Sequence, residues 1–558
     1  MLLLRILYII LANLVIAYSQ EFVEVTISDG RILGRRLESD ENRPFWAFHD
    51  IPYAKPPVGK LRFQEPQPVE KWTGLLNTTD NKKICHQFNP PFSEDPRQTE
   101  DCLVLNVYTP VKPSKCEGET LPVLVWIHGG IFYNGNAGRE VFGPDYFINE
   151  DIIVVTMNYR FGPFGFLSTE DSVIPANAGL KDQQLALKWV QNNIGVFGGD
   201  PSKVTIMGQG YGGFSVGYHI LDKKSEGLFR GGIIQSGSPL TCFALQKYPK
   251  YVTYELGSRI SKEIDHTKSS KQLLEVLQSA SPEDIKKNAL FELPADKLNC
   301  MKHSSGAWSP AKEDESFENA LVTGMNHENI KNGNSNKIPL LIGINSEEVL
   351  TFGIVGLDSL GEMYDDNITT MITGNLNIKD ENKRPAATKL KGLYTNGNLK
   401  DDIPAVISYG SDTIFTTPIA RHAYLQSKYT DVYFYQFSYK GKLGQMEITY
   451  KGAEGVGHAE ELKYLFRDSS NADLNKFPEE DVKTHQRMID LWTQFIKYMN
   501  PTKNPSELTN NLSWPKVTQE NFAYLDINSD LTVAVGPKKY KDFSEIYAEY
   551  ADEKLDTY

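Results

Sequence analysis

The sequence predicts an α/β protein built around a large, mostly parallel sheet with helices on both faces. Three observations lead to this prediction: several short unbroken apolar runs, an amphipathic helix between two of them, and no linker or repeat that would divide the chain. Short runs rich in Val and Ile are typical of strands that are buried on both faces. The chain has 558 residues, of which 40% are hydrophobic, which is enough for one large core.

Five apolar runs are the predicted strands of this sheet, at residues 122–128, 151–159, 203–207, 338–344 and 431–437. Between the second and third runs, residues 179–194 form a predicted amphipathic helix, with apolar positions at Leu180, Leu185, Leu187, Val190 and Ile194. A strand–helix–strand order of this kind joins parallel strands of one sheet. We therefore expect residues 20–558 to form a single domain.

A helix is also predicted near the carboxyl terminus, within about residues 541–558. Phe543, Ile546, Tyr547 and Tyr550 recur at the spacing of one helical stripe. The other face is acidic, with Asp542, Glu545, Glu549, Asp552 and Glu553. Two interpretations stay open: a terminal helix that packs its apolar stripe on the domain, and an acidic docking tail for a partner.

The amino terminus predicts the compartment. Arg5 precedes an apolar run over residues 6–17, and Ala17 and Ser19 are small residues at the −3 and −1 positions of a cleavage site. Residues 1–19 therefore have the pattern of a secretory signal peptide that is cut before Gln20. The run is too short for a membrane span of about 20 residues. We expect a secreted, extracellular protein without a membrane span.

The charge balance excludes some partners. The formal net charge is −13, so the chain has no overall basic field that would attract nucleic acid or anionic lipid. No nucleic-acid partner, no cofactor and no metal ion is expected.

Secretion permits disulfides and N-linked glycans. The cysteines are Cys85, Cys102, Cys116, Cys242 and Cys300, an odd number, so at least one is unpaired or bridges outward. The sequons at Asn77, Asn367 and Asn511 are predicted glycosylation sites on surface loops.

Chemistry is expected at the strand–turn–helix that follows Met207. Residues 208–213 read GQGYGG, which is the glycine frame of a nucleophile elbow, G-x-S-x-G. At this point the chain resembles the type-B carboxylesterase/cholinesterase family of α/β-hydrolases. The resemblance extends over nearly all of the mature chain, in blocks at residues 48–54, 56–59, 61–63, 100–103, 105–108, 128–130, 158–160, 179–183 and 197–201.

The resemblance implies the α/β-hydrolase fold, ester hydrolysis and a set of catalytic positions. Glu348 matches the family's acid, with Glu347 as the near alternative, and His458 matches its histidine. The histidine would act as general base, and the acid would orient it. The order of residues 210, 348 and 458 is the α/β-hydrolase order of nucleophile, acid and histidine.

The resemblance also implies an oxyanion hole and disulfides. The hole would be formed by the backbone N–H groups of Gly129, Gly130 and Tyr211. Cys85 and Cys102 match a family disulfide. Cys242 and Cys300 are a weaker candidate pair, which would leave Cys116 as the odd cysteine.

The nucleophile is absent from the predicted elbow. Gly210 stands at the serine position, Tyr211 replaces a small residue and Gln209 replaces the usual Glu. Without a hydroxyl at position 210 no acyl-enzyme forms at the elbow, and His458 has no hydroxyl to deprotonate. Ser215, five residues beyond Gly210, and Ser236, after the next apolar segment, are alternative serines, but neither lies on the elbow.

Three functional hypotheses follow. The protein is a catalytically deficient relative that binds a protein partner through its surface, as adhesion members of the family do. Alternatively, it holds an apolar ester or lipid-like ligand in the gorge. In the third hypothesis it is an active carboxylic-ester hydrolase with a displaced nucleophile, or Gly210 is an erroneous codon. We favour the first two together, because no nucleophile stands on the elbow.

Overall fold

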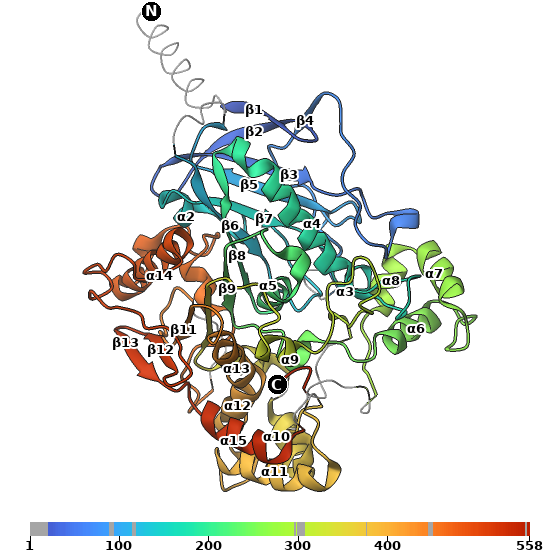
Figure 1. Cartoon of the computed structure of the whole chain (residues 1–558), viewed down its shortest axis with the longest axis vertical. Helices are drawn as coiled ribbons and strands as arrows, with labels where there is room; N and C mark the ends of the chain where they lie inside the picture. The colour runs from blue at the N-terminus through green and yellow to red at the C-terminus, as the bar shows by residue number, and fades with distance from the viewer. Residues whose placement is uncertain are drawn as a thin grey trace, which may run out of the picture.

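A mixed sheet of 13 strands runs through the molecule (Figure 1). The computed structural model describes residues 21–88, 94–113, 119–294, 297, 307–355, 357–374, 376–444, 450–552 and 555–558. The predicted signal peptide lies outside these ranges. The strands are β1 (Phe22–Ile27), β2 (Gly30–Glu38), β3 (Pro44–Pro52), β4 (Leu75–Asn77), β5 (Val104–Thr109), β6 (Leu121–Ile127), β7 (Ile153–Met157), β8 (Gly199–Gln209), β9 (Gly231–Gln235), β10 (Leu340–Asn345), β11 (Val432–Phe437), β12 (Ala523–Ile527) and β13 (Leu531–Val535).

The centre of the sheet is parallel, and its margins are antiparallel apart from the parallel β2–β4 pair. The strand order is β1-β2-β3-β5-β7-β6-β8-β9-β10-β11-β12-β13, and β4 pairs with β2. All neighbours from β7 to β12 are parallel. The five predicted strands correspond to β6, β7, β8, β10 and β11, so the predicted fold class is confirmed. Apart from β9, the strands that the sequence did not predict belong to the margins.

Helices cover both faces of the sheet (Figure 1). The α-helices are α2 (Asp145–Asn149), α3 (Gly162–Phe166), α4 (Ala178–Asn193), α5 (Tyr211–Leu221), α6 (Pro249–Ile260), α7 (Ser270–Ser279), α8 (Pro282–Asn288), α9 (Asn326–Lys331), α10 (Leu357–Asp366), α11 (Asp380–Gly392), α12 (Ile403–Ser411), α13 (Thr417–Gln426), α14 (Glu479–Tyr498) and α15 (Tyr540–Tyr550). The predicted helix at 179–194 is α4. None of the described helices has the length and apolar character that a membrane crossing needs.

Alternate side chains of the central strands enter two separate cores. In β6, Val123 and Val125 belong to the core that includes residues of α4 and α5, whereas Leu124 and Trp126 belong to the core that includes residues of α14. Successive residues of a strand point to opposite faces of the sheet. Both faces of β6 are therefore apolar, which explains its unbroken apolar sequence.

The terminal helix α15 packs its apolar stripe on the domain. Phe543, Ile546 and Tyr547 are buried in the core shared with α4 and α5. On the acidic side, Glu549 pairs with Lys389 of α11 at 2.6 Å. The helix ends at Tyr550.

A buried ion pair joins two of the sequence blocks that follow β7. The Nε and Nη2 atoms of Arg160 donate to the two carboxylate oxygens of Asp182 at 2.8 and 2.7 Å. The two side chains are 3% and 0% exposed. Burial raises the pKa of Asp182, and the Arg160 guanidinium acts against that shift. The pair fixes α4 to the chain beyond β7.

We expect Asp182→Asn to lower the free energy of unfolding by about 3–5 kcal/mol, because it leaves the Arg160 guanidinium buried without a counter-charge. Urea denaturation measures this loss. The control is Glu545→Gln, which breaks an exposed pair with Lys541 at 3.8 Å and should change stability little. A loss at Asp182 no larger than that of the control would contradict the expectation.

Candidate active site

The chain passes from β8 into α5 through one residue, Gly210. Its φ is 56° and its ψ is −119°, a left-handed conformation that strains a residue with a side chain but not a glycine. The Gly210 N–H donates to the carbonyl oxygen of Gln235 at 2.8 Å. The turn has the place and the backbone geometry of a nucleophile elbow. It presents no side-chain atom.

His458 and Glu348 form a hydrogen-bonded pair beside this turn. The Nδ1 atom of His458 lies 2.7 Å from Oε2 of Glu348. Glu348 is fully buried, and its other oxygen, Oε1, accepts the Asn345 N–H at 2.7 Å. Glu347, the alternative acid, instead accepts the Gly455 N–H at 2.8 Å. Because a carboxylate accepts only, His458 donates from Nδ1, and its Nε2 lone pair faces the elbow.

The elbow and the imidazole are in close contact. A carbon atom placed as Cβ on Gly210 would lie 2.8 Å from Nε2 of His458. The Nε2 atom is also 2.9 Å from the side-chain nitrogen of Gln209. The sequence predicts Gly210, Glu348 and His458 as one site, and the structure brings them together. No local sequence pattern predicts the contact of Gln209 with His458, although Gln209 departs from the Glu that the resemblance implies at this position.

The predicted oxyanion loop follows β6 and packs against the end of β8. A side chain on Gly129 has no room, since its Cβ would lie 2.7 Å from the backbone oxygen of Gln209. Gly130 has a φ of 107°, which glycine adopts without strain. The loop thus lies next to the elbow.

Tyr211 begins α5 with its ring among aromatic side chains. Its ring centroid lies 4.9 Å from that of Phe132 and 4.6 Å from that of Phe214. Burial raises the pKa of the Tyr211 phenol. The phenol is therefore a neutral packing group next to the predicted oxyanion loop.

A second buried carboxyl lies beside Glu348. Glu461 accepts hydrogen bonds from the side-chain amides of Asn345 at 2.7 Å and Gln235 at 3.1 Å. Burial, and then the charge of Glu348, raise the pKa of Glu461 to about 7. Only the fold reveals this group, because it lies three residues after His458 among many acidic residues of the chain.

Neither alternative serine takes the nucleophile's role in this arrangement. Ser215 is buried on α5, donates to the Tyr211 carbonyl oxygen at 3.1 Å and accepts from Gln183 at 3.1 Å. The Oγ atom of Ser236 is buried without a hydrogen-bond partner, so it is not bonded to His458. A nucleophilic serine needs a hydrogen bond to its base.

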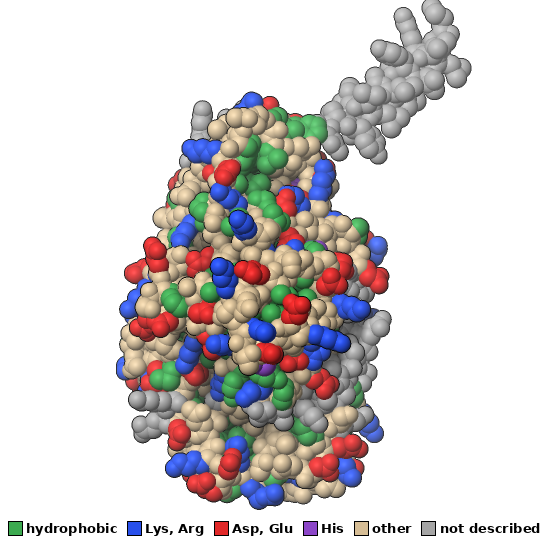
Figure 2. Space-filling view, turned by 90° about the vertical axis from the view of Figure 1, so that its right-hand side faces the viewer, with side chains coloured by type: hydrophobic (Ala, Val, Ile, Leu, Met, Phe, Trp, Pro, Cys, Tyr) green, Lys and Arg blue, Asp and Glu red, His purple; other side chains and the backbone are tan. Residues whose placement is uncertain are grey.

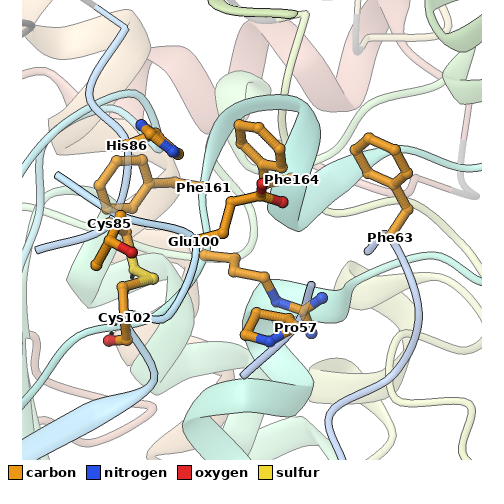
Figure 3. Close-up of a pocket in the computed structure, with 10 residues that line it drawn as sticks. Pro57, Phe63, Cys85, His86, Glu100, Cys102, Phe161 and Phe164 are labelled. Carbon is orange, nitrogen blue, oxygen red and sulfur yellow. Dashed lines mark hydrogen bonds between the residues drawn. A yellow bond between two sulfur atoms is a disulfide. The ribbon is translucent and has the colours of Figure 1, made fainter. Parts of the chain in front are cut away.

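The described pockets lie away from these residues. The cavity of Figure 3 is next to the Cys85–Cys102 disulfide, between Phe63, Phe161 and Phe164, and its volume is about 10 Å³, room for about one water molecule. Two larger pockets, of about 250 and 330 Å³, are lined mainly by charged and polar side chains. None of these three pockets is lined by Gly210, Glu348 or His458.

The structure also places the cysteines and sequons. Cys85 and Cys102 form a disulfide, and Cys242 is disulfide-bonded as well. Cys116 and Cys300 lie outside the described residues. The sequon residues Asn77, Asn367 and Asn511 are all exposed. Among the described residues, no cluster of three or more His, Cys, Asp or Glu side chains is arranged to hold a metal ion.

Comparisons with known proteins identify the family. Residues 21–544 match the carboxylesterase family. The chain is 32% identical to venom carboxylesterase-6 of Apis mellifera, over 90% of each chain, and 32% identical to juvenile hormone esterase of Tribolium castaneum, over 92% of this chain and 90% of that one. The solved structure of juvenile hormone esterase from Manduca sexta, with OTFP covalently attached, superposes with a TM-score of 0.82 at 27% identity, covering 95% of this chain and 99% of that one. The chain belongs to the carboxylesterase family and has the α/β-hydrolase fold.

The raised pKa of Glu461 predicts a pH-dependent stability. Between an unfolded pKa of 4.5 and a folded value of about 7, Glu461 holds the proton mainly in the folded state, so its own contribution to stability falls as pH rises through this window and levels off above it. From pH 5 to pH 8 the loss is about 2 kcal/mol. Buried histidines whose pKa is lowered, such as His219 and His422, change stability in the opposite direction, so urea denaturation measures this loss as the difference between the unmodified chain and a variant without the Glu461 carboxyl.

Glu461→Gln should remove this part of the pH dependence, because the amide does not titrate. Altered hydrogen bonds in the variant lower the free energy of unfolding equally at both pH values. The quantity to compare is therefore the change in the free energy of unfolding between pH 5 and pH 8. Glu454→Gln, at an exposed residue of the segment that precedes Glu461, is the control. An unchanged slope in Glu461→Gln would show that Glu461 does not gain a proton on folding.

Proposed function

We propose that this member of the carboxylesterase family is catalytically deficient and acts by binding rather than by hydrolysing esters. The proposal depends on one observation: the residue on the elbow that faces His458 is Gly210. Ester hydrolysis by this family's chemistry needs an attacking oxygen at that point, and glycine has none. At position 210 the pair of Glu348 and His458 faces a glycine, which offers no hydroxyl to activate.

A protein partner recognised at the surface is the favoured ligand. The mostly apolar cavity has room for about one water molecule, and the two larger pockets are lined mainly by charged and polar groups. An apolar ester or lipid-like ligand would need a far larger apolar space than these three pockets of the described residues offer. The face in Figure 2 has basic and acidic side chains interspersed with small apolar areas, so recognition there would combine both kinds of contact.

We expect the purified chain neither to turn over an aryl ester nor to bind an organophosphate probe covalently. Loss of such a nucleophile lowers kcat by about six orders of magnitude. Absorbance assays measure turnover, and intact mass spectrometry measures covalent labelling. A serine esterase of the same family, assayed in parallel, is the positive control. Stoichiometric labelling of the unmodified chain would overturn the proposal.

We also propose that the protein is secreted. The Cys85–Cys102 disulfide and the three exposed sequon asparagines support this proposal, since both modifications belong to the secretory pathway. Expressed in insect cells, the protein should appear in the medium with Gln20 as its first residue and with glycans that a glycosidase removes. Amino-terminal sequencing and the mass shift measure these outcomes.

Retention of the chain inside the cell with residues 1–19 attached would contradict secretion. Native mass spectrometry of the same material also tests the kind of ligand. The expected mass is that of polypeptide and glycans alone, whereas a co-purifying apolar molecule would favour a carrier over a surface-binding protein.

A further inference from the structure

We infer that Gln209 is a positioning residue whose side-chain amide occupies the place of the missing nucleophile and holds His458 inactive. This inference rests on the proposed function and extends it, because it assigns the loss of catalysis to two residues. It concerns the space between His458, Gly210 and the loop at Gly129.

Both ring nitrogens of His458 make hydrogen bonds. Its Nδ1 atom donates to Oε2 of Glu348 at 2.7 Å, which leaves a lone pair on Nε2. The Gln209 amide donates to that Nε2 at 2.9 Å. In a triad, this lone pair takes the proton of the nucleophile. Here an amide that belongs to the protein already engages it.

The space around Gly210 is occupied by the side chains of His458 and Gln209. The Gln209 side chain reaches from His458 toward the predicted oxyanion loop, since a Cβ on Gly129 would lie 3.3 Å from its Oε1 atom. A Cβ on Gly210 would lie 2.8 Å from Nε2 of His458. The imidazole and the amide together fill the region that a hydroxyl at position 210 would need.

The contact with Nε2 of His458 needs a hydrogen-bond donor at residue 209. The resemblance described above gives Glu at this position, and a carboxylate has no hydrogen to donate to Nε2. The amide of Gln supplies that hydrogen. The contact with His458 therefore depends on having Gln rather than Glu at position 209. Replacing Gly210 alone leaves this contact in place.

Four variants of the secreted chain test the inference: Gly210→Ser, Gly210→Ser with Gln209→Glu, Gly210→Ser with Gln209→Ala, and Gly210→Ser with Gln184→Ala. Each is treated with an organophosphate probe, and labelling of residue 210 is followed by mass spectrometry. Both variants that lack Gln209 should label at least about tenfold faster than Gly210→Ser, the factor of one typical hydrogen bond. The Gln184 control, whose amide bonds to Asp222 and Ser225, should match Gly210→Ser.

Each outcome separates the two proposals. Labelling of the unmodified chain would overturn the proposed function. If the unmodified chain is inert and Gly210→Ser labels as fast as the variants that lack Gln209, the inference fails and the proposed function stands. Inert but folded variants throughout would also overturn the inference, because the obstacle would then lie elsewhere.

A second measurement needs no serine. Diethyl pyrocarbonate acylates the free lone pair of a neutral imidazole, and peptide mapping reports the modification of His458. Gln209→Ala should raise that rate by about tenfold over the unmodified chain, because the hydrogen bond from the Gln209 amide to the lone pair is lost. Gln184→Ala should leave it unchanged. Equal rates in the unmodified chain and in Gln209→Ala would overturn the inference.

Discussion

The close approach of β6, β8 and α5 is the constraint on which the rest of the site depends. β8 enters α5 with no loop between them, and a Cβ on Gly212 would lie 2.1 Å from the carbonyl oxygen of Ile127 at the end of β6. Glycine is required at such an approach whether or not the turn bears a nucleophile. Because the carboxyl ends of parallel strands share one edge of a sheet, the same packing gathers Gly129, Gly210 and Glu348 beside His458.

The buried acid then explains why His458 is retained. Glu348 is fully buried, and a buried carboxylate needs hydrogen-bond partners in every state of the protein. His458 supplies one at 2.7 Å and the Asn345 N–H supplies another. Removing the imidazole would leave an oxygen of Glu348 unpaired, next to a second carboxyl at Glu461. The pair thus has a structural reason to persist without catalysis, so its presence is not evidence of turnover.

The sequence predicts some parts of this molecule better than others for physical reasons. The central strands are buried on both faces, so their apolar runs are continuous, as in β6. A marginal strand such as β1 alternates exposed and buried residues over Phe22–Ile27 and leaves a weaker pattern. The positions 210, 348 and 458 are marked by local motifs and their order. The contacts of Gln209 with His458 and of Glu461 with Gln235 join residues 249 and 226 positions apart, and no local sequence pattern encodes such contacts.

Gly210 and Gln209 both favour the arrangement in which the Gln209 amide contacts Nε2 of His458. A serine at position 210 would hold a φ of 56°, a strained conformation that an active site sustains because the hydroxyl bonds to its histidine. In this chain the Gln209 amide makes that bond to Nε2, so a side chain at 210 would bring the strain without the bond. Glycine at 210 removes the strain and lets His458 approach to within 2.8 Å of where a Cβ would stand. Glycine at 210 avoids the strained side chain, and Gln209 gives Nε2 of His458 a hydrogen-bond donor, so the proposed inactive site is a self-consistent packing.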